Sequence, residues 1–230
     1  MDAMLNDLAG KQVIEGEDPR WISYFDSREI LQLSGEEEFF PGFLESLVEN
    51  NPVTGNLLEL MDQTVSRMRL VVEFRDMKQA PSRAKIIQCC TAMHLTSLIL
   101  NAFFAHLRAS EVRLQLRLQS DWLSTATFTH TVSPAKVSES GRGGRTVGAL
   151  IDEAVAVLSS NPLPSCMYEV AYCSANLLLC AFSAELYEEN GEELFIGYLQ
   201  VRSRAQVKSA LAEKSKDTTF TMPACFVRGL

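Results

Sequence analysis

Apolar residues recur at intervals of three and four along most of the chain, the spacing that places them on one face of an α-helix. The clearest stripe runs from Asn56 and comprises Leu57, Leu58, Met61, Val65 and Met68. Similar apolar segments lie within 40–48, 84–108, 147–158 and 167–184. The segment 112–118 fits both an alternating strand and a helix face, and we predict it to be helical. The pattern therefore predicts an all-α protein.

The stretch 49–57, ENNPVTGNL, separates two of these predicted helices. Pro52 disfavours the helical conformation in the residue before it, so the first helix is expected to end near Asn50. Asn and Gly adopt left-handed backbone angles at low cost, and Asn56 followed by Glu59 has the spacing of a capping box. The stretch therefore predicts a helix corner in which Asn56 caps the second helix.

A second Asn-Pro pair, Asn161-Pro162, follows the apolar run 147–158 in the same way. Repeated helix pairs that each leave an apolar face uncovered are typical of α-solenoids such as armadillo and HEAT proteins. We therefore expect one helical-repeat domain over residues 1–230. A long flexible loop at about 124–145 would interrupt it, and an irregular tail at about 215–230 would end it.

The chain carries 29 acidic and 21 basic residues, a formal net charge of -8. This charge repels a phosphate backbone and gives no long-range attraction to anionic lipid, so no nucleic-acid partner is expected. The best candidate for a local basic patch is KVSESGRGGR, with Lys136, Arg142 and Arg145. Its Ser and Gly residues favour a flexible solvated loop instead.

The six cysteines lie mostly within apolar helical segments and are interpreted as reduced, packed thiols. Cys166, Cys173 and Cys180 recur every seven residues, too far apart along a helix to converge on one metal ion. Adjacent Cys89 and Cys90 have no cation beside them in the sequence to stabilise a thiolate. No metal site or cofactor is predicted.

The segment 84–108 has no charged residue between Lys85 and Arg108, and it is long enough to cross a bilayer. Its polar side chains favour a helix buried between neighbouring helices over an integral membrane protein that uses 84–108 and 168–184. His94 and His106 are then expected to be hydrogen-bonded histidines of the core or a groove rather than ligands.

The sequence contains no nucleophile elbow, phosphate loop, zinc box or dinucleotide fingerprint. The three acidic residues Glu36, Glu37 and Glu38 are adjacent, so on a helix their side chains point in different directions and are unlike paired catalytic carboxylates. Acidic residues are favoured at a helix amino terminus, and we interpret this run in that way. We predict no catalytic residue and no small-molecule substrate, and thus a protein that is not an enzyme.

The segment LVENNPVTGNL, residues 47–57, resembles the motif with which the amino-terminal region of the dymeclin family passes between two helices. Upstream, LAGKQVIEGEDPRWISYF at 8–25 is similar to the family's Leu-x-Gly, acidic, Asp-Pro-x-Trp segment in the same order. The resemblance continues more weakly through 84–108 and through LPSCMYEVAYCSANLLL. We carry over as a structural family motif Asn50, Asn51, Pro52, Gly55 and Asn56.

The resemblance implies a cytoplasmic protein attached peripherally to the Golgi apparatus, with a role in Golgi organisation and in vesicle traffic between the endoplasmic reticulum and the Golgi. It also implies a solenoid-like helical scaffold without enzymatic activity, whose partners are proteins of the trafficking machinery. The alternative is a generic cytosolic helical-repeat adaptor for protein–protein interaction.

The chain departs from this family at both ends. Dymeclin-like proteins can begin with Met-Gly and be myristoylated, whereas this chain begins Met1-Asp2, so we expect no myristoylation site and no signal peptide. Family members are also longer, and the ending TFTMPACFVRGL lacks a helical closing unit. We therefore expect the amino-terminal portion of a family protein, either as a fragment or as a divergent gene model.

Overall fold

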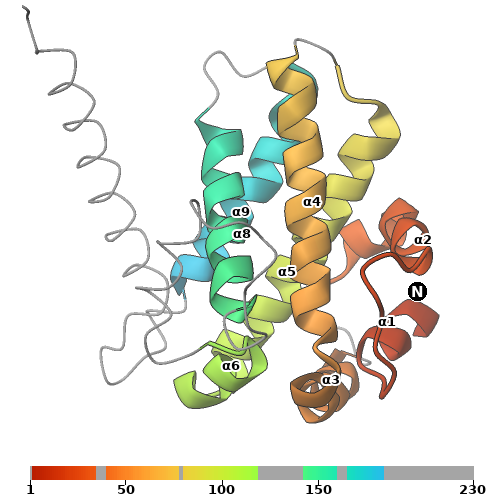
Figure 1. The fold of residues 1–230 in the computed structure, drawn as a ribbon, viewed down its shortest axis with the longest axis vertical. Helices are drawn as coiled ribbons and strands as arrows, with labels where there is room; N and C mark the ends of the chain where they lie inside the picture. The colour runs from red at the N-terminus through yellow and green to blue at the C-terminus, as the bar shows by residue number, and fades with distance from the viewer. Residues whose placement is uncertain (1, 35–39, 78–79, 119–141, 160–164, 184–230) are drawn as a thin grey trace, which may run out of the picture.

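The computed structural model describes residues 2–34, 40–77, 80–118, 142–159 and 165–183 (Figure 1). Every regular element within these ranges is helical, which confirms the predicted all-α class. The elements are α1 (Asp2–Leu8), α2 (Arg20–Asp26), the 3-10 helix η1 (Arg28–Gln32), α3 (Phe40–Thr54), α4 (Asn56–Asp76), α5 (Arg83–His106), α6 (Ala109–Gln115), α8 (Arg142–Leu158), the 3-10 helix η5 (Ser165–Met167) and α9 (Tyr168–Ser183).

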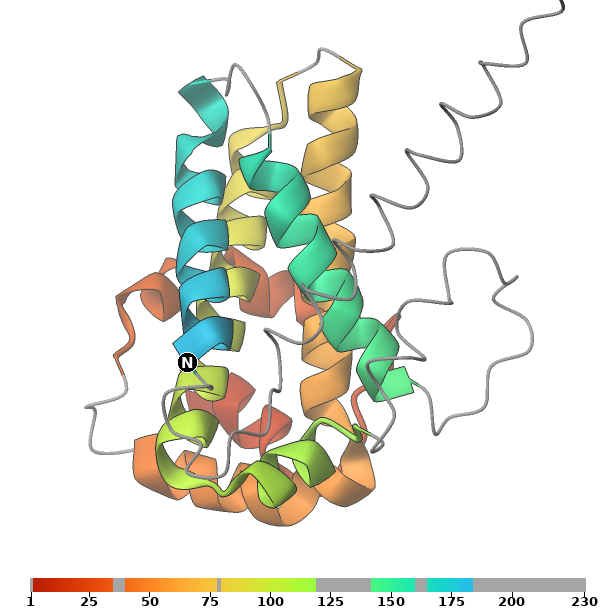
Figure 2. The ribbon, with the colours of Figure 1, turned by 90° about the vertical axis from the view of Figure 1, so that its left-hand side faces the viewer.

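Four long helices form two hairpins, α4–α5 and α8–α9, which pack side by side (Figures 1 and 2). Helix α4 contacts α8, and the two run in the same direction. At their first turns, Arg142 of α8 is paired with Glu59 of α4. Towards their last turns, Arg75 of α4 donates to the carbonyl of Ala156 in α8 at 3.1 Å.

Helix α5 lies alongside α9 in the same parallel manner. Arg83 at the start of α5 is paired with Glu169 at the start of α9, at 2.6 Å. Further along, the Cys180 thiol donates to the carbonyl of Ser97 at 3.2 Å. Each helix of the second hairpin therefore covers its equivalent in the first, which is how neighbouring units of an α-solenoid stack. A solenoid needs at least three such units, and the described residues hold one stacked pair, so that part of the expectation stays a prediction.

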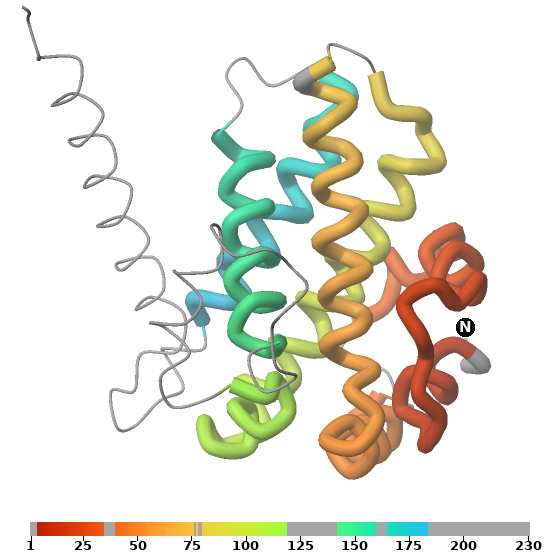
Figure 3. The backbone as a smooth tube through the Cα atoms, in the orientation of Figure 1, coloured from red at the N-terminus to blue at the C-terminus, as the bar shows by residue number. Residues whose placement is uncertain are grey.

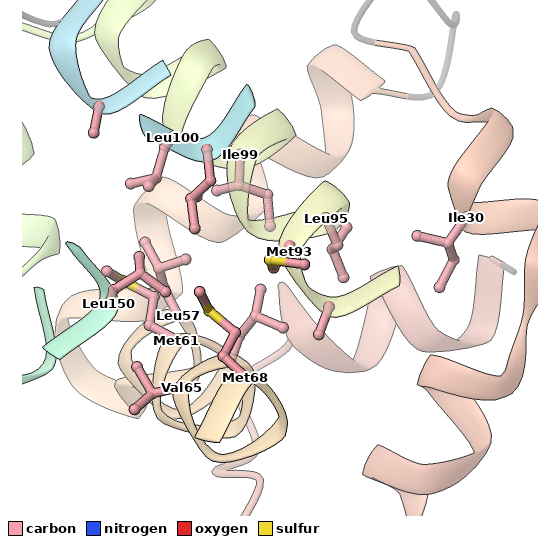
Figure 4. Close-up of a cluster of buried hydrophobic side chains, with 14 of the residues drawn as sticks. Ile30, Leu57, Met61, Val65, Met68, Met93, Leu95, Ile99, Leu100 and Leu150 are labelled. Atoms are coloured by element: carbon pink, nitrogen blue, oxygen red, sulfur yellow. The ribbon is translucent and has the colours of Figure 1, made fainter. Parts of the chain in front are cut away.

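The core is centred between these four helices and extends to the short helices around them (Figure 4). Its central contacts join α4 to α5 through Met61, Met68, Met93 and Ile99, all fully buried. Arg83–His106 and Ser165–Ser183 are long and apolar enough to cross a membrane, but 67% of the apolar window of the first is buried inside the protein. This agrees with the prediction that the apolar segment at 84–108 is a helix buried between its neighbours.

Helices α3 and α6 contact each other across one end of the long helices (Figure 3). On another side, α2 and η1 pack against α5, and α1 packs against α3. These contacts attach α2 and η1 to the first hairpin and α1 to α3.

Two predicted boundaries are wrong. Helix α3 does not end near Asn50 but continues to Thr54. Helix α8 begins at Arg142, so residues 142–145 are helical and not part of the loop predicted at about 124–145. The rest of that loop, the Asn161-Pro162 corner and the tail at about 215–230 lie outside the described residues.

The early start of α8 has a packing cause. Gly143 lies against the end of α6, where an added Cβ would come within 2.0 Å of the Leu116 carbonyl oxygen. Glycine in this sequence context allows close contact between helices as well as a flexible loop. Composition alone does not separate these two uses.

Candidate functional site: the α3–α4 corner

Pro52 lies inside the last turns of α3. Because proline has no N–H, the carbonyl of Val48, four residues earlier, loses its helical hydrogen bond. Gln115 of α6 replaces this bond, since its Nε2 donates to the Val48 oxygen at 2.8 Å. The helix therefore continues past Pro52 because a distant element satisfies the group that proline leaves unpaired.

Gly55 ends α3 with a left-handed backbone, φ +70°. Its N–H donates to the carbonyl of Asn51 at 2.8 Å, which closes the helix. The structure thus agrees with the expectation that Gly55 supplies a left-handed turn in this corner. A Cβ at this position would lie 3.0 Å from Nη2 of Arg117.

Arg117 follows α6 and is the one non-glycine residue with a positive φ, 49°, in the part of the chain that the structure describes. It closes α6 as glycine commonly does, because the N–H of Leu118 donates to the carbonyl of Arg113 at 2.8 Å. Its guanidinium donates to the carbonyl of Pro52 at 3.2 Å. A cation at this place satisfies the carbonyls at the end of α3 and complements its helix dipole.

Asn51 is fully buried and joins three helices. Its Oδ1 accepts the N–H of Leu57, in the first turn of α4, at 2.9 Å. Its Nδ2 donates to the backbone carbonyl and to Oε1 of Gln115, both at 2.9 Å. Asn51 therefore caps α4 from the preceding helix, and the prediction that Asn56 is the cap is wrong.

Asn56 instead binds the amino-terminal segment. Its Oδ1 accepts the N–H of Ile14 at 2.9 Å, and its Nδ2 donates to the carbonyls of Gln12 at 2.9 Å and Leu8 at 3.2 Å. Asn50 adds a bond from its Nδ2 to the carbonyl of Ala9 at 2.8 Å. The corner thus fixes a loop that has no regular structure of its own.

The Asp-Pro-x-Trp segment leads into α2, which packs against α5 and is contacted by Arg67 of α4. The indole N–H of Trp21 donates to the carbonyl of Glu15 at 3.0 Å, and its ring stacks on Phe25 with centroids 5.7 Å apart. The guanidinium of Arg67 lies 4.1 Å above the Phe25 ring. Burial lowers the pKa of Arg67 to about 10. These contacts hold α2 against the first hairpin.

The other candidates from the sequence take part in structural contacts. Arg142 is paired with Glu59 and, at 2.7 Å, with Asp62, so it is not part of an open basic patch. Arg145 also has a partner, and Lys136 lies outside the described residues. His94 Nε2 lies 3.1 Å from the carbonyl of Leu33, as expected of a hydrogen-bonded histidine. Within the described ranges no three His, Cys, Asp or Glu residues are placed to hold a metal ion.

The corner, defined as residues 50–57, thus brings the five motif residues together with two that sequence reasoning missed, Gln115 and Arg117. Gln115 lies 64 residues from Asn51 in the chain, and no local pattern marks this pairing. The sequence gives only an indirect signal of this contact. A proline inside a helix leaves the carbonyl four residues earlier without its helical donor, so another group has to donate to that carbonyl. The hydrogen bonds of Asn50, Asn51 and Asn56 go mainly to backbone groups of the chain itself, so the arrangement positions backbone.

The fold and this corner together define an all-helical protein of stacked hairpins, in which a buried polar corner connects α3, α4 and α6. A family model described as "Dymeclin: Dyggve-Melchior-Clausen syndrome protein" matches residues 1–216. The chain therefore belongs to the dymeclin family.

Two curated relatives carry the same name. The chain is 26% identical over 190 residues to dymeclin of Rattus norvegicus, which covers 80% of this chain and 27% of the relative. It is 26% identical over 193 residues to dymeclin of Mus musculus, covering 80% of this chain and 26% of the relative. The chain thus matches about a quarter of the length of these relatives, and no solved structure matches it.

Proposed function

We propose that this protein is a non-catalytic, Golgi-associated helical scaffold that serves Golgi organisation and vesicle traffic between the endoplasmic reticulum and the Golgi. Membership of the dymeclin family supports the cellular role. The polar groups of the corner support a structural task, because they are used in contacts within the chain. The observation that carries the scaffold proposal is an apolar face of α9.

This face, called here the α9 seam, follows a spacing of four, three, four and three residues: Tyr168, Tyr172, Ala175, Leu179 and Phe182. Such spacing is typical of a helix that packs lengthwise against another helix. Three of these side chains are nonetheless largely exposed, Tyr168 at 62%, Tyr172 at 69% and Leu179 at 66%. Phe182 packs partly against the core, and the tyrosines line a cavity beside α5, but the exposed part of this face is apolar surface available for packing.

The stacking of the two hairpins indicates what would cover this seam. Hairpin α8–α9 covers one side of α4–α5 with its helices parallel to their equivalents. A following hairpin would cover α9 in the same way, and the relatives have most of their length outside the matched region. We therefore propose that in a protein of full family length the α9 seam contacts the next helical hairpin, which extends an α-solenoid.

Hydroxyl-radical footprinting tests the seam. The oxidation of each side chain is compared between the 230-residue chain and a version extended to full family length. Tyr168 and Tyr172 should be oxidised rapidly in the shorter chain and protected in the longer one. Leu114 on α6, which is 60% exposed and lies far along the chain from the seam, is the control and should react equally in both. Equal oxidation of the two tyrosines in both proteins would remove the solenoid proposal.

The cellular role needs a separate experiment. Both versions are tagged with a fluorescent protein and compared with a Golgi marker, and membranes are then washed with alkaline carbonate. A peripheral Golgi scaffold should overlap with the marker and be released by carbonate. A diffuse signal from both versions would favour the generic cytosolic adaptor, and resistance to carbonate would favour an integral membrane protein.

A further inference from the structure

Two cysteines from different hairpins meet at the interface of α5 and α9. Cys90 comes from α5 and is buried, whereas Cys173 comes from α9 and is half-buried. The two side chains lie close enough for each thiol to shift the pKa of the other. They are 83 residues apart in sequence, so only the parallel stacking of the two hairpins brings them together.

Both thiols also line one cavity of about 460 Å³ at the start of α5 and α9. Its charged lining residues are Arg28, Arg83 and Glu169. Arg83 and Glu169 are paired with each other at 2.6 Å, near the rim, where both side chains are more than half exposed. The cavity gives a small polar molecule access to a pair of thiols that the helix interface would otherwise enclose.

The two thiols are not equivalent. Hydrogen bonding by Cys90 lowers the pKa of Cys173, whereas the same interaction, together with burial, raises the pKa of Cys90. Cys173 is therefore the better nucleophile of the two, and its thiolate form is the reactive one.

The remaining described cysteines lack this arrangement. Cys89 is fully buried, and burial raises the pKa of its thiol. Cys180 donates to the carbonyl of Ser97, and burial raises its pKa to about 12. Cys166 is half-buried next to the start of α9 and does not line this cavity.

We propose that Cys90 and Cys173 are a site of oxidative modification, at which a peroxide converts the two thiols into a disulfide that links the two helical hairpins. The Cys173 thiolate attacks one oxygen of hydrogen peroxide and forms a sulfenic acid, and the other oxygen leaves and takes up a proton as water. The sulfur of Cys90 then attacks the Cys173 sulfur, loses its proton and expels hydroxide, which becomes the second water. Two thiols and one peroxide thus give one disulfide and two waters.

The product joins α5 to α9 and so fixes the second hairpin on the first. A thiol reductant reverses it by thiol–disulfide exchange. The site is independent of the proposed cellular role, since it requires only the stacking of the two described hairpins.

Mass spectrometry of the whole 230-residue protein tests this site. The reduced protein is treated with hydrogen peroxide, free thiols are blocked, and the cross-link is located by fragmentation of the linked peptides. We expect a mass loss of about 2 Da, one Cys90–Cys173 cross-link, and recovery of the original mass with a thiol reductant.

Single alanine variants supply the controls. Cys90→Ala and Cys173→Ala should each abolish the cross-link, whereas Cys89→Ala, the immediate neighbour, should retain it. Circular dichroism before oxidation shows whether each variant is folded. If a variant is unfolded, the position of the cross-link in the unsubstituted protein decides the test. A cross-link through Cys89 or Cys180 instead, or oxidation to sulfinic acid without any cross-link, would overturn the proposal.

Discussion

The α3–α4 corner and the α9 seam reverse the usual distribution of polar and apolar groups. In the corner, Asn51 and Asn56 are 0% and 1% exposed, and they hold backbone groups from distant parts of the chain. On the seam, Tyr172 and Leu179 face outward. A buried amide satisfies its hydrogen bonds only in one arrangement of its neighbours, so the corner specifies this fold. The seam requires only apolar area, so it suits contact with a further helix.

The largest effect is expected from removing the amide of the corner with Asn51→Ala. This change leaves the Leu57 N–H and two acceptors of Gln115 without their partners in a buried place. Each unpaired buried group costs about 1–3 kcal/mol, and we expect the free energy of unfolding to fall by about 3 kcal/mol. Urea denaturation measures it. Asn176→Ala, at an exposed position of α9, is the matched control and should change the stability by less than about 0.5 kcal/mol.

A smaller loss is expected from Gly143→Ala, where α8 meets the end of α6. The added Cβ would approach the Leu116 oxygen to 2.0 Å, so the backbone of one helix has to move, at a cost of about 2 kcal/mol. The control is Gly42→Ala in α3, where the Cβ meets nothing within 4 Å. That variant should raise the stability by about 0.5–1 kcal/mol, since alanine favours a helix. Equal thermal stability of the two variants would contradict the proposed contact.

Gly55→Ala should cost about 1 kcal/mol, because alanine adopts the required φ of +70° less easily than glycine. Gly55→Asn should cost less, since asparagine tolerates left-handed backbone angles better than other side chains. Thermal denaturation followed by circular dichroism compares the two variants. If alanine and asparagine behave alike, the close approach of Arg117 rather than the backbone angle limits this position.

The smallest effect is expected on the seam itself. Leu179→Gln replaces a largely exposed side chain of α9, so the unfolding free energy should change by no more than about 0.5 kcal/mol. Leu177→Gln, two residues earlier and 2% exposed, should cost several times as much because it buries an amide in the core. A large loss at Leu179 in the 230-residue chain would show that the seam is already covered.

Periodicity was sufficient to predict the longer helices, because each buries one face, but it did not predict α1, α2 or η1. It predicted a helix rather than a strand at 112–118, which is confirmed for 112–115, but α6 ends at Gln115 and so excludes Leu116 and Leu118. It could not place the end of α3, because the cost of Pro52 depends on Gln115 in another helix. For the same reason the sequence assigned the cap of α4 to Asn56, the residue in the expected local position, while the structure uses Asn51.

The cysteines show a similar limit. A seven-residue spacing on one helix indicates a packed stripe, and this remains true of Cys180. The pairing of Cys173 with Cys90 depends on the register between two hairpins, which periodicity does not contain. Local rules thus identified the longer helices, and the residues that connect distant elements were visible only in three dimensions.

The separation of 64 residues between Asn51 and Gln115 also has a consequence during protein synthesis. At roughly 5–20 residues per second, a ribosome needs roughly 3 to 13 s to translate that interval. Throughout this time the nascent α4 lacks the complete hydrogen-bond network at its amino terminus, and the Val48 carbonyl has no donor from α6. The hydrogen bonds of the α3–α4 corner are therefore completed late. A nascent chain that ends before residue 115 would depend on chaperones for protection.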